Sequence, residues 1–284
     1  MLNRTNVNDF QNPNQVWRSI LDKILTLGSY CEPRGLGITE ILGHTSVWDM
    51  NRPLITTPSR ALGYKFAAAE SWWIMDGRND LESIGPYSKA VSRFSDDGEV
   101  FFGAYGPWVI RQLRYIVDTL FMDKDSRQAT MSIWQQNPGF SKDIPCTLTL
   151  QWFIREEKLH CMANMRSSDA WLGVPYDVVN FSNISIGILS ELRFKYPDLE
   201  LGKLVLNAGS QHIYDTNYRA ARIAVDDIDT LFSYLPYGRA DQLVSWVGTV
   251  DHLRGLKDLE AGVDTWLSEI ITYYRQKDEK NGET

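Results

Sequence analysis

Cys146 is the residue whose type and surroundings best suit nucleophilic chemistry in this sequence. It begins a strand-like run that ends at Ile154, and a second run begins at Leu159 after a short polar turn. Antiparallel pairing of the two runs brings Arg166 and Ser167 beside Cys146 at the open end of the hairpin. A nearby positive charge lowers the pKa of a thiol and increases the fraction of reactive thiolate. The alternative is that Cys146 is a small buried residue at the start of a strand.

The register of this hairpin follows from the position of its turn. With the turn centred in Arg155–Lys158, Cys146 lies opposite Ser167 and Thr147 lies opposite Arg166. A bulge could move the pairing by one residue, but the guanidinium would stay close to the thiol in either case.

Composition limits the class of protein. Three cysteines are an odd number for a chain of 284 residues, so we expect no disulfide framework and interpret Cys31 and Cys161 as structural. The chain is 43% apolar, which allows a sizeable core. A formal net charge of -7 argues against a surface that coats a nucleic-acid polymer, but it permits a local phosphate pocket. No apolar run could span a membrane and the N-terminus is polar, so we expect a cytoplasmic protein without a signal peptide.

The elements that position Cys146 mix helices and strands without regular alternation, which is typical of an α+β fold. We expect helices over 64–75, 108–122 and 177–194, and strands over 129–134, 146–154, 159–165 and 203–207. Residues 1–284 are interpreted as a single domain, with a polar N-terminal arm over 1–14 and a divergent helical C-terminal segment over 223–284.

One long motif carries a family resemblance. The run Arg166-Ser-Ser-Asp-Ala-Trp-Leu-Gly-Val-Pro-Tyr-Asp-Val-Val-Asn180 closely resembles the nucleotide- and folate-binding segment of thymidylate synthases. Other stretches resemble further parts of that family in the same order, namely a phosphate loop at 33–37, a strand at 53–57, a catalytic-glutamate helix at 70–77, and segments at 125–127, 144–147 and 209–214. The resemblance covers about residues 15–217. It implies a mixed β-sheet packed with helices, in a homodimer that forms through the sheet.

The resemblance implies a reaction for two of these residues. The Cys146 thiolate would add to C6 of a pyrimidine nucleoside monophosphate, which makes C5 nucleophilic toward the one-carbon unit of 5,10-methylenetetrahydrofolate. Glu70 matches the carboxylate that handles protons, and its apolar neighbours favour partial burial and a raised pKa. Taken alone, Glu70 could instead be a solvated helix carboxylate. No metal is implied.

The resemblance also assigns ligand contacts. The nucleotide would be held by Arg34, Tyr105, Arg166, Ser167, Ser168, Asp169, Asp177, His212 and Tyr214, and Arg127 would cross to the phosphate site of the partner subunit. Among these, His212 and Tyr214 would bind the sugar hydroxyl from one side of an extended segment. The folate would contact Asp169, Leu172, Gly173 and Tyr176. For each of these arginines alone, a surface salt bridge would be the default interpretation.

Asp177 stands where uracil-specific members of the family carry asparagine. A carboxylate accepts a hydrogen bond from the cytosine amino group but repels the O4 of uracil, so cytosine is the expected base. Family frequency alone favours the deoxynucleotide, dCMP. The alternative is that Asp177 is only an N-cap for the following helix. Nothing in the sequence tests tolerance of a 2'-hydroxyl, so CMP stays open.

Other departures from the family concern the product. Thr147 replaces a common histidine, Gln128 an arginine and Asn180 a serine. No tryptophan-bearing cover is recognisable over 84–97, and a polar run at 278–284 stands where the family has a hydrophobic tail. A wetter site favours water over hydride as the final reactant, and hence a hydroxymethyl product. A dCMP C5-methyltransferase, a thymidylate synthase acting on dUMP and a non-catalytic nucleotide- or RNA-binding relative remain alternatives, as does a viral origin in a host cytoplasm.

Overall fold

The fold is seen in a computed structural model that describes residues 12–136, 138–227 and 245–258. Six strands form one mixed sheet in the order β1-β2-β6-β5-β4-β3. They are β1 (Ser29–Cys31), β2 (Ile38–Asp49), β3 (Thr130–Ser132), β4 (Thr147–Arg155), β5 (Lys158–Asp169) and β6 (Glu200–Tyr214). The central β5 and β6 pair in parallel and the other neighbours are antiparallel, which makes this the α+β fold expected from the sequence.

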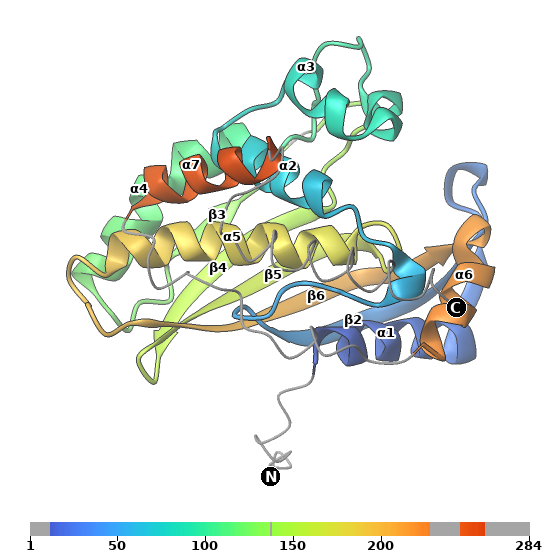
Figure 1. Cartoon of the computed structure of the whole chain (residues 1–284), viewed down its shortest axis with the longest axis horizontal. Coiled ribbons are helices and arrows are strands. Elements are labelled where there is room, and N and C mark those ends of the chain that lie inside the picture. Colours follow the sequence, from blue (N-terminus) through green and yellow to red (C-terminus); the bar gives the residue numbers. More distant parts are fainter. Residues whose placement is uncertain (1–11, 137, 228–244, 259–284) are drawn as a thin grey trace, which may run out of the picture.

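The helices lie around this sheet. They are α1 (Pro13–Leu27), α2 (Tyr64–Met75), α3 (Leu81–Ile84), α4 (Gly106–Met122), α5 (Val174–Leu192), α6 (Asp215–Val225) and α7 (Trp246–Lys257), with short 3-10 turns η1 (Pro33–Gly35), η2 (Pro58–Arg60), η3 (Gly85–Tyr87) and η4 (Lys89–Phe94). Figure 1 shows α5 along one face of the sheet, with α2, α4 and α7 packed beside it. Because α5 is buried almost all round, it is the centre of the core.

The two faces of the sheet differ. On β5 the side chains from Leu159 to Met165 alternate between buried and half-buried. The half-buried face carries a row of polar side chains that crosses four strands. Thr45 Oγ1 lies 2.9 Å from Asn207 Oδ1, Asn207 Nδ2 donates to Asn164 Oδ1 at 3.0 Å, and Asn164 Nδ2 donates to Thr149 Oγ1 at 3.0 Å. This row, the Thr45–Thr149 ladder, links the registers of β2, β6, β5 and β4.

The expected strand over 53–57 is wrong. This segment is irregular, because the side chain of Asn14 satisfies its backbone: Asn14 Oδ1 accepts from Thr56 N at 2.7 Å, and Asn14 Nδ2 donates to Thr56 Oγ1 at 2.9 Å. The end of the expected N-terminal arm is also wrong. Asn12 caps α1 and the helix begins at Pro13, while residues 1–11 lie outside the described part.

The C-terminal segment is helical where it is described. The helix α7 packs against α2 and α5. The indole of Trp246 donates to the carbonyl of Met75 at 3.2 Å, and Trp246 N donates to Glu191 at 2.7 Å. The rest of the expected 223–284 segment beyond Asp227, apart from 245–258, lies outside the described residues, as does the 278–284 run.

Candidate active site

The β4–β5 hairpin has the expected register over most of its length. Thr149 pairs with Asn164 and Arg155 with Lys158, but a bulge after Thr147 places that residue opposite Met165. The expected pairing of Thr147 with Arg166 is therefore wrong by one residue. The Arg166 N–H instead donates to the carbonyl of Cys146 at 2.9 Å, which keeps the arginine beside the cysteine.

Arg166 and Ser167 flank the thiol of Cys146. Arg166 Nη2 lies 3.7 Å and Ser167 Oγ 3.6 Å from the sulfur atom. The guanidinium is fixed in this place because its Nε donates to the carbonyl of Pro145 at 3.0 Å and its Nη2 to that of Ile144 at 2.9 Å. The half-buried thiol thus has a cation and a hydroxyl within reach.

The pKa of the Cys146 thiol is raised, not lowered as expected from the sequence. Burial raises it most, Arg166 and Ser167 act in the opposite direction, and the negative charges of Asp177 and Asp143 raise it further. The arginine therefore offsets part of the burial cost of the thiolate without reversing it.

Glu70 reaches the site from α2 and contacts α5. Asn180 Nδ2 donates to Glu70 Oε2 at 2.7 Å. Burial raises the pKa of Glu70 to about 7, and the hydrogen bond from Asn180 acts in the opposite direction. A carboxyl with this pKa can both accept and return a proton near neutral pH, which is what its apolar neighbours in the sequence suggested.

Asp177 lies in the first turn of α5 but does not cap it. Gly173 is the N-cap residue, and the helix begins at Val174. Burial raises the pKa of Asp177 well above its ordinary value, and the carboxylates of Glu70 and Asp169 raise it further. The side chain makes no hydrogen bond to any described residue, so its two oxygens remain available to a ligand.

Tyr105 lies close enough to Cys146 and Asp177 for their charges to affect it. Its hydroxyl oxygen accepts hydrogen bonds from Thr147 Oγ1 at 3.0 Å and from Thr147 N at 3.3 Å. Burial raises its pKa well above the ordinary value, followed by the charges of Asp177 and Cys146. Because the oxygen already accepts twice, the tyrosine proton is left to donate elsewhere in the site.

The expected sugar pair lies at the end of β6. His212 pairs with Asp169 on β5, and Tyr214 pairs with Ile38 on β2. The rings of His212 and Tyr214 meet edge to face with centroids 5.2 Å apart. His212 is buried and its Nδ1 has no hydrogen-bond partner among the described residues.

The residues expected to contact the folate lie at the end of β5 and the start of α5, just before Asp177 in the sequence. They are Asp169, Leu172, Gly173 and Tyr176. Asp169 Oδ1 is already engaged, because it accepts from the N–H groups of Trp171 and Leu172 at 2.8 and 2.9 Å. Tyr176 receives a hydrogen bond from Gly63 N at 3.3 Å, while Leu172 is 42% exposed.

Arg60 is a residue that the sequence analysis missed. Its guanidinium carbon lies 5.4 Å from the Trp171 ring and 5.6 Å from the Tyr176 ring, and its Nε donates to the carbonyl of Trp171 at 3.0 Å. Its position after Pro58 in η2 gave no signal of this contact. The cluster offers a cation and two aromatic faces.

Three of the expected nucleotide contacts do not lie beside the Cys146 thiol, namely Ser168, Arg34 and Arg127. Ser168 points to the other side of β5, where its buried Oγ accepts from Gln211 Nε2 at 3.2 Å. Arg34 is exposed on η1, with a left-handed φ of 56°, and makes no hydrogen bond or ion pair with the described residues. Its loop leads into β2 and so lies at the same end of the sheet as Tyr214.

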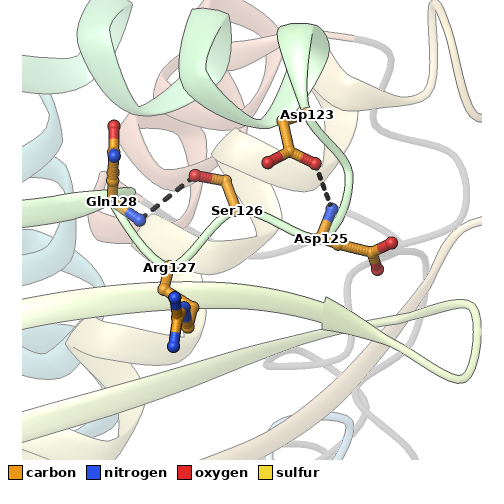
Figure 2. Close-up of a pocket in the computed structure, with 5 residues that line it drawn as sticks. All are labelled: Asp123, Asp125, Ser126, Arg127 and Gln128. Carbon is orange, nitrogen blue, oxygen red and sulfur yellow. Dashed lines mark hydrogen bonds between the residues drawn. The ribbon is translucent and has the colours of Figure 1, made fainter.

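Arg127 lies far along the sheet from Cys146. Gln151 Nε2 donates to the Arg127 carbonyl at 2.8 Å, and Gln151 is five positions from Cys146 along the chain, at about 3.3 Å per position in a strand. Figure 2 shows the Arg127 and Gln128 side chains pointing to opposite sides of the turn. This turn lines a cavity of about 540 Å³ whose described lining residues are Asp123, Asp125, Ser126, Arg127 and Gln128.

Two further properties concern the described residues only. None of their helices is long and apolar enough to cross a membrane. Within the same part of the chain, no group of three or more histidine, cysteine, aspartate or glutamate side chains is arranged to hold a metal ion.

Comparison with known proteins places these features in a family. Residues 15–230 match the family model described as thymidylate synthase. A deoxyuridylate hydroxymethyltransferase of Bacillus phage SP01 is 30% identical over 233 residues, which are 73% of this chain and 58% of that protein. The chain therefore spans a little more than half the length of this relative. The matched region contains Cys146, the carboxyl groups described above, His212 and Tyr214. The chain belongs to the thymidylate synthase family.

Proposed function

We propose that this protein transfers a one-carbon unit from 5,10-methylenetetrahydrofolate to C5 of dCMP and that water completes the reaction, giving 5-hydroxymethyl-dCMP. The observation that carries this proposal is the grouping of a nucleophilic thiol with two high-pKa carboxyl groups. Cys146 lies beside Arg166, and the charge of Glu70 on α2 raises the pKa of Asp177 on α5. Family membership supports the reaction type.

Each group has a role that its surroundings support. The Cys146 thiolate adds to C6 of the base and leaves again at the end, while Arg166 and Ser167 stabilise its negative charge. Glu70 accepts the proton that leaves C5 and can orient the water that adds to the new exocyclic carbon. The folate supplies that carbon, and the ring faces of Trp171 and Tyr176 with the Arg60 cation suit a flat heterocycle with an acidic tail.

The choice of base depends on the protonation of Asp177. A charged carboxylate accepts from the cytosine amino group and repels O4 of uracil, so it selects dCMP. A neutral carboxyl has one donor and one acceptor, which match cytosine in one orientation and uracil in the other. The raised pKa of Asp177 and the name of the phage relative, a deoxyuridylate hydroxymethyltransferase, therefore favour dUMP as a second candidate substrate.

The hydroxymethyl product is supported by the segment that leads from α3 to α4. Residues 84–97 contain no tryptophan and form the short turns η3 and η4 rather than a long covering element. The phage relative is also named as a hydroxymethyltransferase. Water rather than hydride then reaches the exocyclic carbon, and tetrahydrofolate leaves without being oxidised.

We also propose that the protein acts as a homodimer through the half-buried face of the sheet. The Thr45–Thr149 ladder lies on this face, and Arg127 is exposed and remote from the Cys146 of its own chain. Arg127 would then contribute to the phosphate site of the partner subunit. Cross-linking or sedimentation of the wild type and of Arg127→Ala, with mixed-variant complementation, tests this arrangement.

The test of function is direct turnover. The purified protein is incubated with 5,10-methylenetetrahydrofolate and, separately, with dCMP, CMP or dUMP, while the nucleotide mass and the absorbance of dihydrofolate are followed. We expect a gain of CH2O on dCMP without dihydrofolate, and no gain with Cys146→Ser. A methyl gain with dihydrofolate would show a methyltransferase, and turnover of dUMP alone would overturn the substrate assignment.

A further inference from the structure

The apolar helix α5 contains a polar group that faces α2. Asn180 and Asn183 are buried one helical turn apart, and both contact Ser71 on α2. Ser71 is itself buried, and its neighbour in sequence is Glu70. Polar side chains in the interface of two otherwise apolar helices carry a desolvation cost, so their hydrogen bonds have to be accounted for in full.

The hydrogen bonds of this group run in one direction. Asn183 Nδ2 donates to Ser71 Oγ at 2.9 Å, and the Ser71 hydroxyl donates to Asn180 Oδ1 at 2.7 Å. Asn180 Nδ2 then donates to Glu70 Oε2 at 2.7 Å. Every donor in the chain points toward the carboxyl group. This order favours an acceptor at its end, and a carboxylate is the strongest acceptor available.

The orientation of the Asn180 amide is therefore set by Ser71. With the Ser71 proton on Asn180 Oδ1, the NH2 group is the end that faces Glu70. A reversed amide would place its oxygen against the carboxylate and its NH2 group against a hydroxyl that already donates to it. One oxygen of Glu70 is then held, and the other stays available for chemistry.

We propose that Asn180 is a positioning residue that fixes the Glu70 carboxyl group and biases it toward its charged form, with Ser71 and Asn183 holding the amide in the orientation this requires. This inference rests on the proposed function, because it assigns the control of a proton that Glu70 is proposed to move. Among the described residues, Asp177 on α5 interacts electrostatically with Glu70. Asp169 at the end of β5, Tyr105 before α4 and Cys146 before β4 interact in turn with Asp177.

The effect of Asn180 has a definite sign. Burial raises the pKa of Glu70, and the Asn180 donor lowers it. Removal of the donor should move the limb of the kcat/KM profile that Glu70 controls to higher pH by about one unit. On that limb the rate at a fixed pH changes by about tenfold. A merely structural defect would lower the rate without moving the profile.

The experiment compares Asn180→Ala, Ser71→Ala and Glu70→Gln in the full-length protein, with pH profiles of kcat/KM. Ser71→Ala leaves every Glu70 contact in place but frees the amide, so a smaller shift in the same direction is expected. Ser190→Ala is the matched control, because Ser190 is a buried hydroxyl on α5 whose hydrogen bond among the described residues stays within its helix, to Gly187 at 2.7 Å. Its profile should match the wild type.

Difference infrared spectra against Glu70→Gln report the protonation of the carboxyl group without turnover. They keep the inference testable where a variant has low activity. An unmoved limb and an unmoved carboxyl titration in Asn180→Ala would overturn the role of Asn180. Full activity in Glu70→Gln would overturn instead the role of Glu70 in the proposed function, so the two failures are distinguishable.

Discussion

The thiol and the two carboxyl groups are each shifted toward their neutral forms by burial. Arg166 opposes this at Cys146, and Asn180 opposes it at Glu70, but no described residue donates a hydrogen bond to the Asp177 side chain. A nucleotide base is the group that could do so. The protonation state of Asp177 therefore depends on the bound base and on the pH.

The first prediction concerns Asp177→Asn. The amide presents a fixed donor and acceptor, which suit uracil, so the ratio of kcat/KM for dUMP to that for dCMP should rise about ten- to a hundredfold. Competition assays with both nucleotides in one tube measure this ratio. Ser190→Ala, which leaves the site intact, serves as the control. An unchanged ratio would remove Asp177 from base selection.

The second prediction concerns pH in the wild type. At low pH Asp177 is neutral and can match either base, whereas above its raised pKa the charged form repels uracil. Turnover of dUMP relative to dCMP should therefore fall as pH rises. The ratio is measured at several pH values in mixed substrate, which cancels effects common to both. A ratio independent of pH in the wild type would contradict this account.

At the scale of elements, the sequence predicted those parts whose local pattern agrees with the fold. The bounds of α2 are as expected, and the β4–β5 register holds up to the bulge, because alternation along both strands admits one pairing. The strand β6 extends well beyond the expected 203–207, since Gly202 and Gly209 interrupt its pattern. The strand β2 was missed, because its Gly43, at φ 67°, and exposed Leu42 obscure the alternation.

In the site, too, the contacts that follow from local strand pairing could be predicted, and those between distant segments could not. The neighbours of Cys146 could be expected from the hairpin, because they follow from strand pairing. The contacts of Asn180 and Arg60 could not, because they join segments that are distant in the sequence. The sequence signal for Asn180 is the spacing of the asparagines at 180 and 183, which fall one turn apart in an apolar helix.

A prediction at this scale concerns the docking of α7. A Cβ atom on Gly187 would lie 2.5 Å from Cε3 of Trp246 and 2.8 Å from the Met75 methyl group. Gly187→Ala should therefore force α5 and α7 apart and lower the free energy of unfolding by about 1–3 kcal/mol. Urea unfolding measures this. Gly255→Ala on α7 is the control, because its Cβ would meet no atom within 4 Å, and equal stability of the two variants would contradict the packing.

At the scale of the whole molecule, the region that matches the family ends before α7, yet α7 packs on the helix that carries Glu70. The helix that carries Glu70 is therefore part of both the hydrophobic core and the candidate site. The carboxyl groups of Glu70 and Asp177 carry a stability cost for the fold, since their charged forms are held away from water.

A prediction at this scale tests this stability cost. The raised pKa of Glu70 means that its contribution to stability is complete below its ordinary pKa of 4.5 and is lost as pH rises through about 7. Glu70→Gln removes this loss, so the variant should have a higher Tm than the wild type at pH 8. The two Tm values should converge toward pH 5. Thermal unfolding over this pH range measures the difference, and a lower Tm for the variant at pH 8 would contradict the prediction.

The Thr45–Thr149 ladder has a consequence for the order of folding. Its first link joins residues 45 and 207, which are 162 positions apart in the chain, while its last link joins residues 164 and 149 within one hairpin. Chain-closure entropy favours the hairpin link early and delays the link to β2. Protection of the β4–β5 amides in pulsed hydrogen exchange should thus precede that of the β2–β6 amides, and the row would be completed only when the most distant parts of the chain have met.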